Sequence, residues 1–330
     1  GPTLRRATNS AMRRPIPLHR LPLPPAVLRW VLILNFATAG LLGGWYLLQP
    51  AGRQDEVRRL VEGAFARGKN VTFLEIAWDV WHLYYSGTAL GSVAPGDKTF
   101  VYGGAPRPAA AGDEEPRVLV NRGYVAGYSE RLRNPRWVAY RVRDLPRMPT
   151  PKARPEKFDV DRRTASRVAS ESYAGSGYDR GHMAPNYAIA TRYGEAAQRE
   201  TFLMSNITPQ RHALNAGLWR ELEMRIATGY PARYGEVWVI TGPVFGPSPR
   251  TLRGGVAVPA AFFKIIIDEQ DGKLRTLAFL VPQDAPEKAD PGRYLTSIDE
   301  IERRTGLDFL AELDEAAQRA VESVQAGRVW

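Results

Sequence analysis

One histidine with an acid, an arginine and a glycine directly before it is the group in this sequence best placed to do chemistry. It is His182, in the stretch Asp179-Arg180-Gly181-His182, which continues as DRGHMAPN, and only four histidines occur in the 330 residues. Imidazole is the side chain best suited to take a proton near neutral pH. A nearby carboxylate can orient it, and a neighbouring arginine can bind phosphate. The stretch therefore indicates a general base beside a phosphate-binding cation.

Two further polar motifs follow, LMSNITPQ at 203–210 and LNAGLWRELE at 214–223. Apolar residues recur every four positions across 214–228 and predict one helix there; they are Leu214, Leu218, Leu222 and Ile226. On a regular helix Asn215 and Glu223 point to broadly similar sides, about 12 Å apart along the axis. One hydrated cation could then bind Asn215 directly and meet Glu223 through a water, which suits Mg²⁺ because this ion keeps several waters. Without the histidine motif, the same residues also describe an ordinary helix with a surface glutamate.

The motifs DRGHMAPN, SNITPQ and LNAGLW-x-x-x-E together resemble the DNA/RNA non-specific endonucleases, the ββα-metal nucleases related to Serratia nuclease and endonuclease G. The resemblance covers roughly residues 100–312 and extends to WVAYRV, VITGPVF, VAVPAAFFKIII and DEIERRTGL. It implies an α+β protein with the ββα-metal (His-Me finger) nuclease fold, a central, mostly antiparallel sheet flanked by helices. It also implies Mg²⁺-dependent hydrolysis of phosphodiester bonds in DNA and RNA, with Mn²⁺ as a substitute ion and a homodimer as an expected assembly.

The resemblance also implies a role for each residue of the site. His182 matches the general base that activates a water for attack on phosphorus. Asn215 matches the sole protein ligand of the metal, and Glu223 matches the acid that holds a metal-bound water. Arg180 matches a phosphate contact, and Arg154, in a more variable loop, stands where the family has a second such arginine.

Four further positions complete the expected site. Asp179 and Asn206 match residues that orient the histidine and shape its loop. Ala227 stands where some relatives carry an additional arginine, which leaves fewer phosphate contacts. His212 is close in sequence and is either a solvated loop residue or a substrate contact. None of these groups reads a base edge, so we expect cleavage with little sequence preference.

The net charge of the chain is weaker evidence for nucleic-acid binding than its total suggests. The formal net charge is +10, but residues 1–30 hold six arginines and no acid. Without them 39 basic and 35 acidic residues remain, a net charge of +4. The absence of cysteine excludes disulfides, thiolate metal sites and cysteine nucleophiles, and is compatible with any compartment.

The N-terminal residues predict a membrane anchor. An Arg- and Pro-rich tail at 1–29 precedes the apolar run 30–48, WVLILNFATAGLLGGWYLL. Nineteen residues at about 1.5 Å each cover roughly 28 Å, close to the thickness of a bilayer. The arginines predict a cytoplasmic N-terminus and a catalytic domain on the far side, so a bacterial inner membrane facing the periplasm is expected. A cleaved signal peptide with a secreted enzyme, a buried segment and a mitochondrial address are the alternatives.

The remaining chain divides into a membrane-proximal helical and aromatic region at 49–99 and the nuclease domain at 100–330. Helices are expected at 51–68, from the capping box at Ser297-x-x-Glu300, and near 310–325. Residues 104–116 read as a loop. Strands are expected at 117–128, 137–142, 236–245, 256–268 and 274–281, with Asp271-Gly272 as the turn between the last two.

Two rival functions fit parts of this pattern. One is an inactive relative that binds nucleic acid at a membrane, against which stand the intact His182, Asn215 and Glu223. The other is a phosphodiesterase that acts on another substrate, such as a lipid head group, which the aromatic segment at 70–86 and the anchor would favour.

Overall fold

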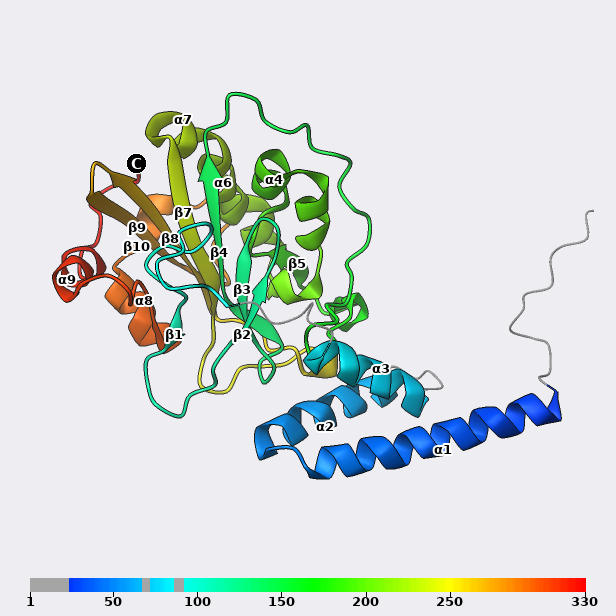
Figure 1. Cartoon of the computed structure of the whole chain (residues 1–330). Coiled ribbons are helices and arrows are strands. Elements are labelled where there is room, and N and C mark those ends of the chain that lie inside the picture. The colour runs from blue at the N-terminus through cyan, green and yellow to red at the C-terminus, as the bar shows by residue number, and fades with distance from the viewer. Residues whose placement is uncertain (1–23, 67–71, 86–91) are drawn as a thin grey trace, which may run out of the picture.

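A seven-stranded sheet forms the centre of the protein, and every neighbouring pair in it is antiparallel (Figure 1). The order is β10-β9-β8-β7-β4-β3-β2. The strands are β2 (Arg117–Val120), β3 (Val125–Ser129), β4 (Asn134–Arg143), β7 (Glu236–Val244), β8 (Ala261–Gln270), β9 (Lys273–Pro282) and β10 (Leu295–Thr296). This computed structural model describes residues 24–66, 72–85 and 92–330, so the predicted tail lies largely outside the described residues. The expected antiparallel α+β fold is confirmed.

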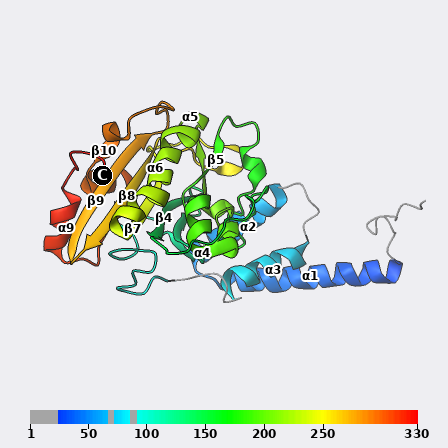
Figure 2. The ribbon, with the colours of Figure 1, turned by 90° about the horizontal axis from the view of Figure 1, so that it is seen from above.

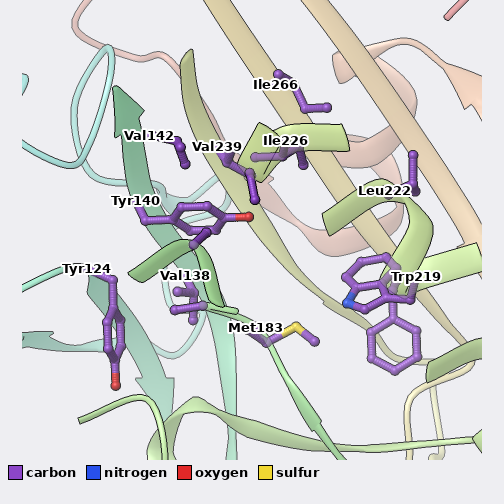
Figure 3. Close-up of a cluster of buried hydrophobic side chains, with 14 of the residues drawn as sticks. Tyr124, Val138, Tyr140, Val142, Met183, Trp219, Leu222, Ile226, Val239 and Ile266 are labelled. Carbon is purple, nitrogen blue, oxygen red and sulfur yellow. The ribbon is translucent and has the colours of Figure 1, made fainter. Parts of the chain in front are cut away.

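The two faces of the sheet are covered by different helices because successive side chains of a strand alternate. On β4, Val138 and Tyr140 belong to the core under α4 (Asn186–Glu200) and α6 (Arg220–Met224), whereas Trp137 belongs to the core under α8 (Ile298–Thr305) and α9 (Glu315–Glu322). Figure 2 shows α6 lying against β7 and β8. The core on that face is drawn in Figure 3, where Met183, the residue after the motif histidine, lies among these side chains.

Local signals explain most element boundaries. Asp271 and Gly272 have φ values of +51° and +73°, as a two-residue turn between antiparallel strands requires. The Ser297 side chain accepts a hydrogen bond from the Glu300 amide and starts α8. The expected loop at 104–116 contains a two-residue strand, β1 (Arg107–Pro108), which pairs with β11 (Leu307–Asp308). The predicted strand at 117–128 is a hairpin, β2 and β3.

The predicted helix over 214–228 is not regular. The segment consists of α5 (His212–Leu214), the π-helical turn η4 (Asn215–Trp219), α6, a second π-helical turn η5 (Arg225–Gly229) and α7 (Tyr230–Tyr234). A π-helical turn bonds i to i+5 and is wider than an α-helical turn. The angle and rise calculated for a regular helix between Asn215 and Glu223 therefore do not apply.

Three N-terminal helices pack on one another and on the sheet domain: α1 (Pro25–Leu47), α2 (Ala51–Ala66) and α3 (Phe73–Tyr84) (Figure 1). No described residue of α1 is buried, and this helix is long and apolar enough to cross a membrane. The Phe73 amide donates to Asn35 Oδ1 at 2.9 Å, so α3 lies along α1.

Salt bridges join this helical unit to the sheet domain. The buried Arg117 of β2 reaches Glu56 of α2 at 2.7 Å and Glu130 at 3.2 Å. Asp79 of α3 pairs with Arg162 at 3.6 Å. The helical unit is therefore docked on the sheet domain through charges as well as apolar contacts.

Candidate active site

A small hairpin carries the histidine motif. Strand β5 (Asp179–His182) pairs antiparallel with β6 (Ile207–Gln210), and α4 follows. A Cβ on Gly181 would lie 2.8 Å from the Cβ of Gln210, so any other residue at this position of the motif would force the hairpin to shift. The two strands and the helix form the ββα unit that was expected.

Asn206 holds the chain after the histidine. Its Oδ1 accepts from the Ala184 amide at 2.8 Å, and its Nδ2 donates to the carbonyl oxygens of Ala184 and Thr201 at 3.0 and 2.9 Å. The side chain is wholly buried, so these bonds are not exchanged with water. Asn206 thus fixes the backbone that follows the histidine.

His182 is buried between two aromatic rings. Its ring centre lies 4.9 Å from that of Phe202 and 5.5 Å from that of Phe158, and Nε2 has no hydrogen-bond partner. Burial, and then the positive charge of Arg154, lowers the pKa of His182 to about 3. The ring is therefore neutral near pH 7, the state in which an imidazole nitrogen can accept a proton.

Asp179 contacts the residue expected to bind the metal, not the histidine of its own motif. Its Oδ2 accepts from Asn215 Nδ2 at 2.9 Å and from His212 Nδ1 at 2.8 Å. These contacts of Asp179 Oδ2 run across to η4 and to His212, and its expected role in orienting His182 stays a prediction. With Nδ2 engaged, the Oδ1 of Asn215 is the atom left for a cation.

A close backbone contact shapes the turn that carries Asn215. Gly217 has a non-helical conformation (φ −99°, ψ −114°), and a Cβ there would lie 2.3 Å from the backbone oxygen of Glu287. Leu214 and Leu218, on either side, are fully buried. The turn is therefore fixed from the sheet side and from the neighbouring loop at once.

Glu223, on α6, is a half-buried acid. Its Oε1 is buried without a hydrogen-bond partner. Burial raises the pKa of Glu223 to about 7, and the positive charges of Lys264 and Arg154 oppose that rise. A carboxylate of this kind is available to a proton or to a hydrated cation.

The two expected arginines lie beside the aromatic rings that enclose His182. The Arg154 guanidinium is exposed and lies 5.4 Å from the centre of the Phe202 ring. Its charge acts on both His182 and Glu223, so these three groups lie in one region. Arg180 lies 5.8 Å from the centre of Phe158 and donates to the Ser170 carbonyl at 2.7 Å. Both cations are near enough to the histidine to meet a phosphate there.

Several residues of this region were not anticipated. Phe158 and Phe202 enclose the histidine, and Lys264, fully buried on β8, faces the glutamate. A lysine inside the apolar run AFFKIII was the one visible signal. Ala227 is buried in the core, so this position of η5 faces inward.

The residues present fit a hydrated divalent cation. The amide oxygen of Asn215 and the half-buried carboxylate of Glu223, whose Oε1 has no hydrogen-bond partner, are hard oxygen donors, which Mg²⁺ prefers. So few protein donors suit an ion that retains most of its waters.

Comparisons with known proteins agree with this geometry. Residues 104–316 match the family model described as DNA/RNA non-specific endonuclease. The chain is 33% identical over 218 residues to mitochondrial endonuclease G of Homo sapiens, covering 58% of this chain and 68% of that protein. It is 32% identical over 216 residues to a nuclease of Serratia marcescens, covering 62% and 79%. It is 32% identical over 217 residues to the mitochondrial nuclease EXOG of Danio rerio, covering 60% of this chain and 62% of that protein.

A solved structure is similar as well. The crystal structure of the EndoG/EndoGI complex, described as showing the mechanism of EndoG inhibition, matches with a TM-score of 0.54 and 26% identity. The match covers 60% of this chain and 86% of that chain.

Proposed function

The chain belongs to the DNA/RNA non-specific endonuclease family, and from that membership we propose that it is a Mg²⁺-dependent endonuclease that cuts DNA and RNA without sequence preference. One observation carries the proposal: a neutral, buried His182 whose Nε2 has no protein partner lies near Arg154, whose charge also acts on Glu223. A proton acceptor, a phosphate-binding cation and a carboxylate are the groups that phosphodiester hydrolysis needs in one place.

In the proposed reaction His182 accepts a proton from the water that attacks phosphorus. Its neutral ring and its position between Phe158 and Phe202 keep the accepting nitrogen in place. Arg154 and Arg180 neutralise charge on the phosphate. Asn215 would hold the ion, oriented by Asp179, and Glu223 would hold one of its waters.

When bound, Mg²⁺, or Mn²⁺ in its place, supplies positive charge that stabilises the phosphorus centre during attack. The protein groups named above meet phosphate rather than base edges. Both sugars and all sequences should therefore be accepted.

We also propose that the chain is divided and located as its composition suggests: a tail at 1–29, an anchor at 30–48, a membrane-proximal region at 49–99 and a nuclease domain at 100–330. The exposed, apolar α1 supports the anchor. The arginines before it support a catalytic domain outside the bacterial cytoplasm, facing the periplasm. A mitochondrial location, which the names of two relatives carry, is the alternative.

Two measurements test these parts of the proposal. Protease accessibility of the C-terminus in intact cells tests the orientation, and protection of the C-terminus on the cytoplasmic side would refute it. The mass of the membrane-bound chain distinguishes an anchor from a cleaved signal. A second copy is the proposed protein partner, and sedimentation in detergent measures it.

The activity is tested with the full chain in detergent, incubated with plasmid DNA, RNA or a lipid phosphodiester, with Mg²⁺, Mn²⁺ or EDTA. We expect cleavage of both nucleic acids, lost in EDTA and in His182→Ala. Wild-type protein that binds DNA and never cuts it would identify an inactive relative. Cleavage of the lipid alone would identify a different phosphodiesterase.

A further inference from the structure

Lys264 is a charged side chain in the middle of the core. It lies on β8 between Phe263 and Ile265 and is fully buried. Its Nζ lies 4.1 Å from the centre of the Trp219 ring and has no hydrogen-bond partner. A cation–π contact recovers part of the cost of burying an ammonium group, but an uncompensated buried charge remains unfavourable. A lysine in this place therefore calls for a negative partner.

Glu223 supplies that negative charge from beyond the 4.0 Å of a direct salt bridge. Trp219 and Glu223 are four residues apart along η4 and α6, so the ring against which Lys264 rests stands beside the glutamate. Burial lowers the pKa of Lys264 to about 8, and Glu223 is the charged group that opposes this shift. The reverse holds for Glu223, on which Lys264 is the strongest of the acting cations, ahead of Arg154 and Arg220. The two groups are thus coupled inside the core.

Neutral polar atoms complete the surroundings of this pair. Tyr140 Oη, Glu223 Oε1 and Lys264 Nζ are buried and have no hydrogen-bond partner, while the Trp219 side chain acts on Glu223 as a hydrogen-bond donor. Burial, and then the charge of Glu223, raises the pKa of Tyr140 well above its usual value, so Tyr140 also faces the glutamate. Buried groups of this kind are commonly satisfied through ordered water. Together, Tyr140, Trp219 and Lys264 form the polar surroundings of the Glu223 carboxylate.

We propose that Lys264 is a positioning residue for the active site: its ammonium, held over Trp219, supplies the counter-charge that keeps the half-buried Glu223 carboxylate in place to hold a water of the metal. This inference rests on the proposed nuclease function and adds a residue of the central sheet to the surroundings of the glutamate. Arg154 acts from a surface loop, whereas Lys264 acts from the sheet. Through Lys264, the sheet contributes to the charge of the site as well as to its shape.

The test uses the full chain with Lys264→Met, which keeps the length of the side chain and removes its charge. Glu223→Gln and the double variant Lys264→Met/Glu223→Gln complete the set, and Lys273→Met, an exposed lysine at the start of β9, is the matched control. Urea denaturation at pH 8 in EDTA is measured first. We expect the urea midpoint to fall in Lys264→Met and to recover largely in the double variant, because glutamine at position 223 carries no charge that needs a counter-charge.

The second readout is the pH profile of plasmid cleavage. Without Lys264 the glutamate ionises at higher pH, so Lys264→Met should lose roughly tenfold in rate at pH 7 and recover to within about threefold of wild type at pH 9. Lys273→Met should follow the wild type throughout. A merely structural role would lower the rate by the same factor at every pH.

Either of two results would overturn the pairing: strictly additive effects of the two substitutions on the urea midpoint, or an unshifted pH profile in Lys264→Met. Failure of the wild type to cleave would refute the proposed function instead. The denaturation experiment does not depend on cleavage, so it still decides whether Lys264 and Glu223 are coupled.

Discussion

Asp179 and Asn215 are 36 residues apart and are joined by a hydrogen bond of 2.9 Å from Nδ2 to Oδ2. This bond links the strand that carries His182 to the turn that carries the expected metal ligand. An amide has one donor end and one acceptor end, so engagement of the donor by a carboxylate leaves the oxygen for a cation. The two halves of the site are therefore oriented by one acid.

Asp179→Ala should weaken metal binding more than it slows the chemical step. Without its acceptor Asn215 can rotate, and partners of this kind typically change metal affinity by about 10–100-fold. The Mg²⁺ concentration at half-maximal cleavage should rise by that factor. His212→Ala, which removes the other, exposed partner of Asp179, is the control and should change it by about threefold or less. Equal effects of the two substitutions would contradict the assignment.

His182→Ala should lower the single-turnover rate of plasmid nicking by roughly 10²–10⁴-fold, the scale of general-base catalysis. The Mg²⁺ dependence should stay close to that of the wild type, since the histidine is not an expected ligand. A cavity would remain between Phe158 and Phe202, so added imidazole should restore part of the rate. A loss smaller than tenfold would remove His182 from its proposed role.

The same histidine should make folding stability depend on pH. The pKa of His182 is about 3 in the folded protein and 6.5 in the unfolded chain, so the unfolded chain binds the proton first as pH falls. The stabilisation is complete above pH 6.5 and is lost as pH falls toward 3, by on the order of 4 kcal/mol. Urea denaturation of the wild type and His182→Gln in EDTA between pH 7 and 4 measures it. Parallel curves for the two proteins would show that the ring is not buried in solution.

The two glycines of the π-helical turns should respond differently to substitution. A Cβ on Gly217 would lie 2.3 Å from the Glu287 backbone, whereas nothing lies within 4 Å of one on Gly229. Gly217→Ala should destabilise the protein by about 1–3 kcal/mol and reduce cleavage, because the turn that carries Asn215 must shift. Gly229→Ala should be neutral or stabilising by up to about 1 kcal/mol. Thermal unfolding and plasmid cleavage, measured for both variants, test this prediction.

Arg117→Gln should loosen the helical unit from the sheet domain. The substitution leaves the buried Glu130 without its cation and removes the contact with Glu56 of α2. Breaking a buried pair costs about 3–5 kcal/mol, so the midpoint of unfolding should fall and α2 should exchange amide hydrogens faster. Arg131→Gln, which removes an exposed pair with Glu114, should change stability by less than about 1 kcal/mol.

Much of the fold follows from local patterns. Alternating apolar residues predicted the strands around Trp137 and Trp238, and the Asp271-Gly272 turn predicted the hairpin of β8 and β9. These signals depend only on residues close to one another along the chain. Three short motifs likewise indicated the family, and the match of the family model to residues 104–316 confirms it. The π-helical turns at 215–219 and 225–229 were not predicted. The π-helical turn at Gly217 lies against the backbone of Glu287, which is 70 positions further along the chain.

The sequence by itself determined which residue types could do the chemistry: a histidine, an asparagine and a glutamate in a recognisable order. The tertiary structure decided their partners. Asp179 binds Asn215 across two elements, and Lys264 acts on Glu223 of α6 from strand β8. Periodicity reports which face of an element is buried, but not which polar groups from distant elements meet there. Charge compensation in a core is a long-range property, so it becomes visible only when the sheet and helices are packed together.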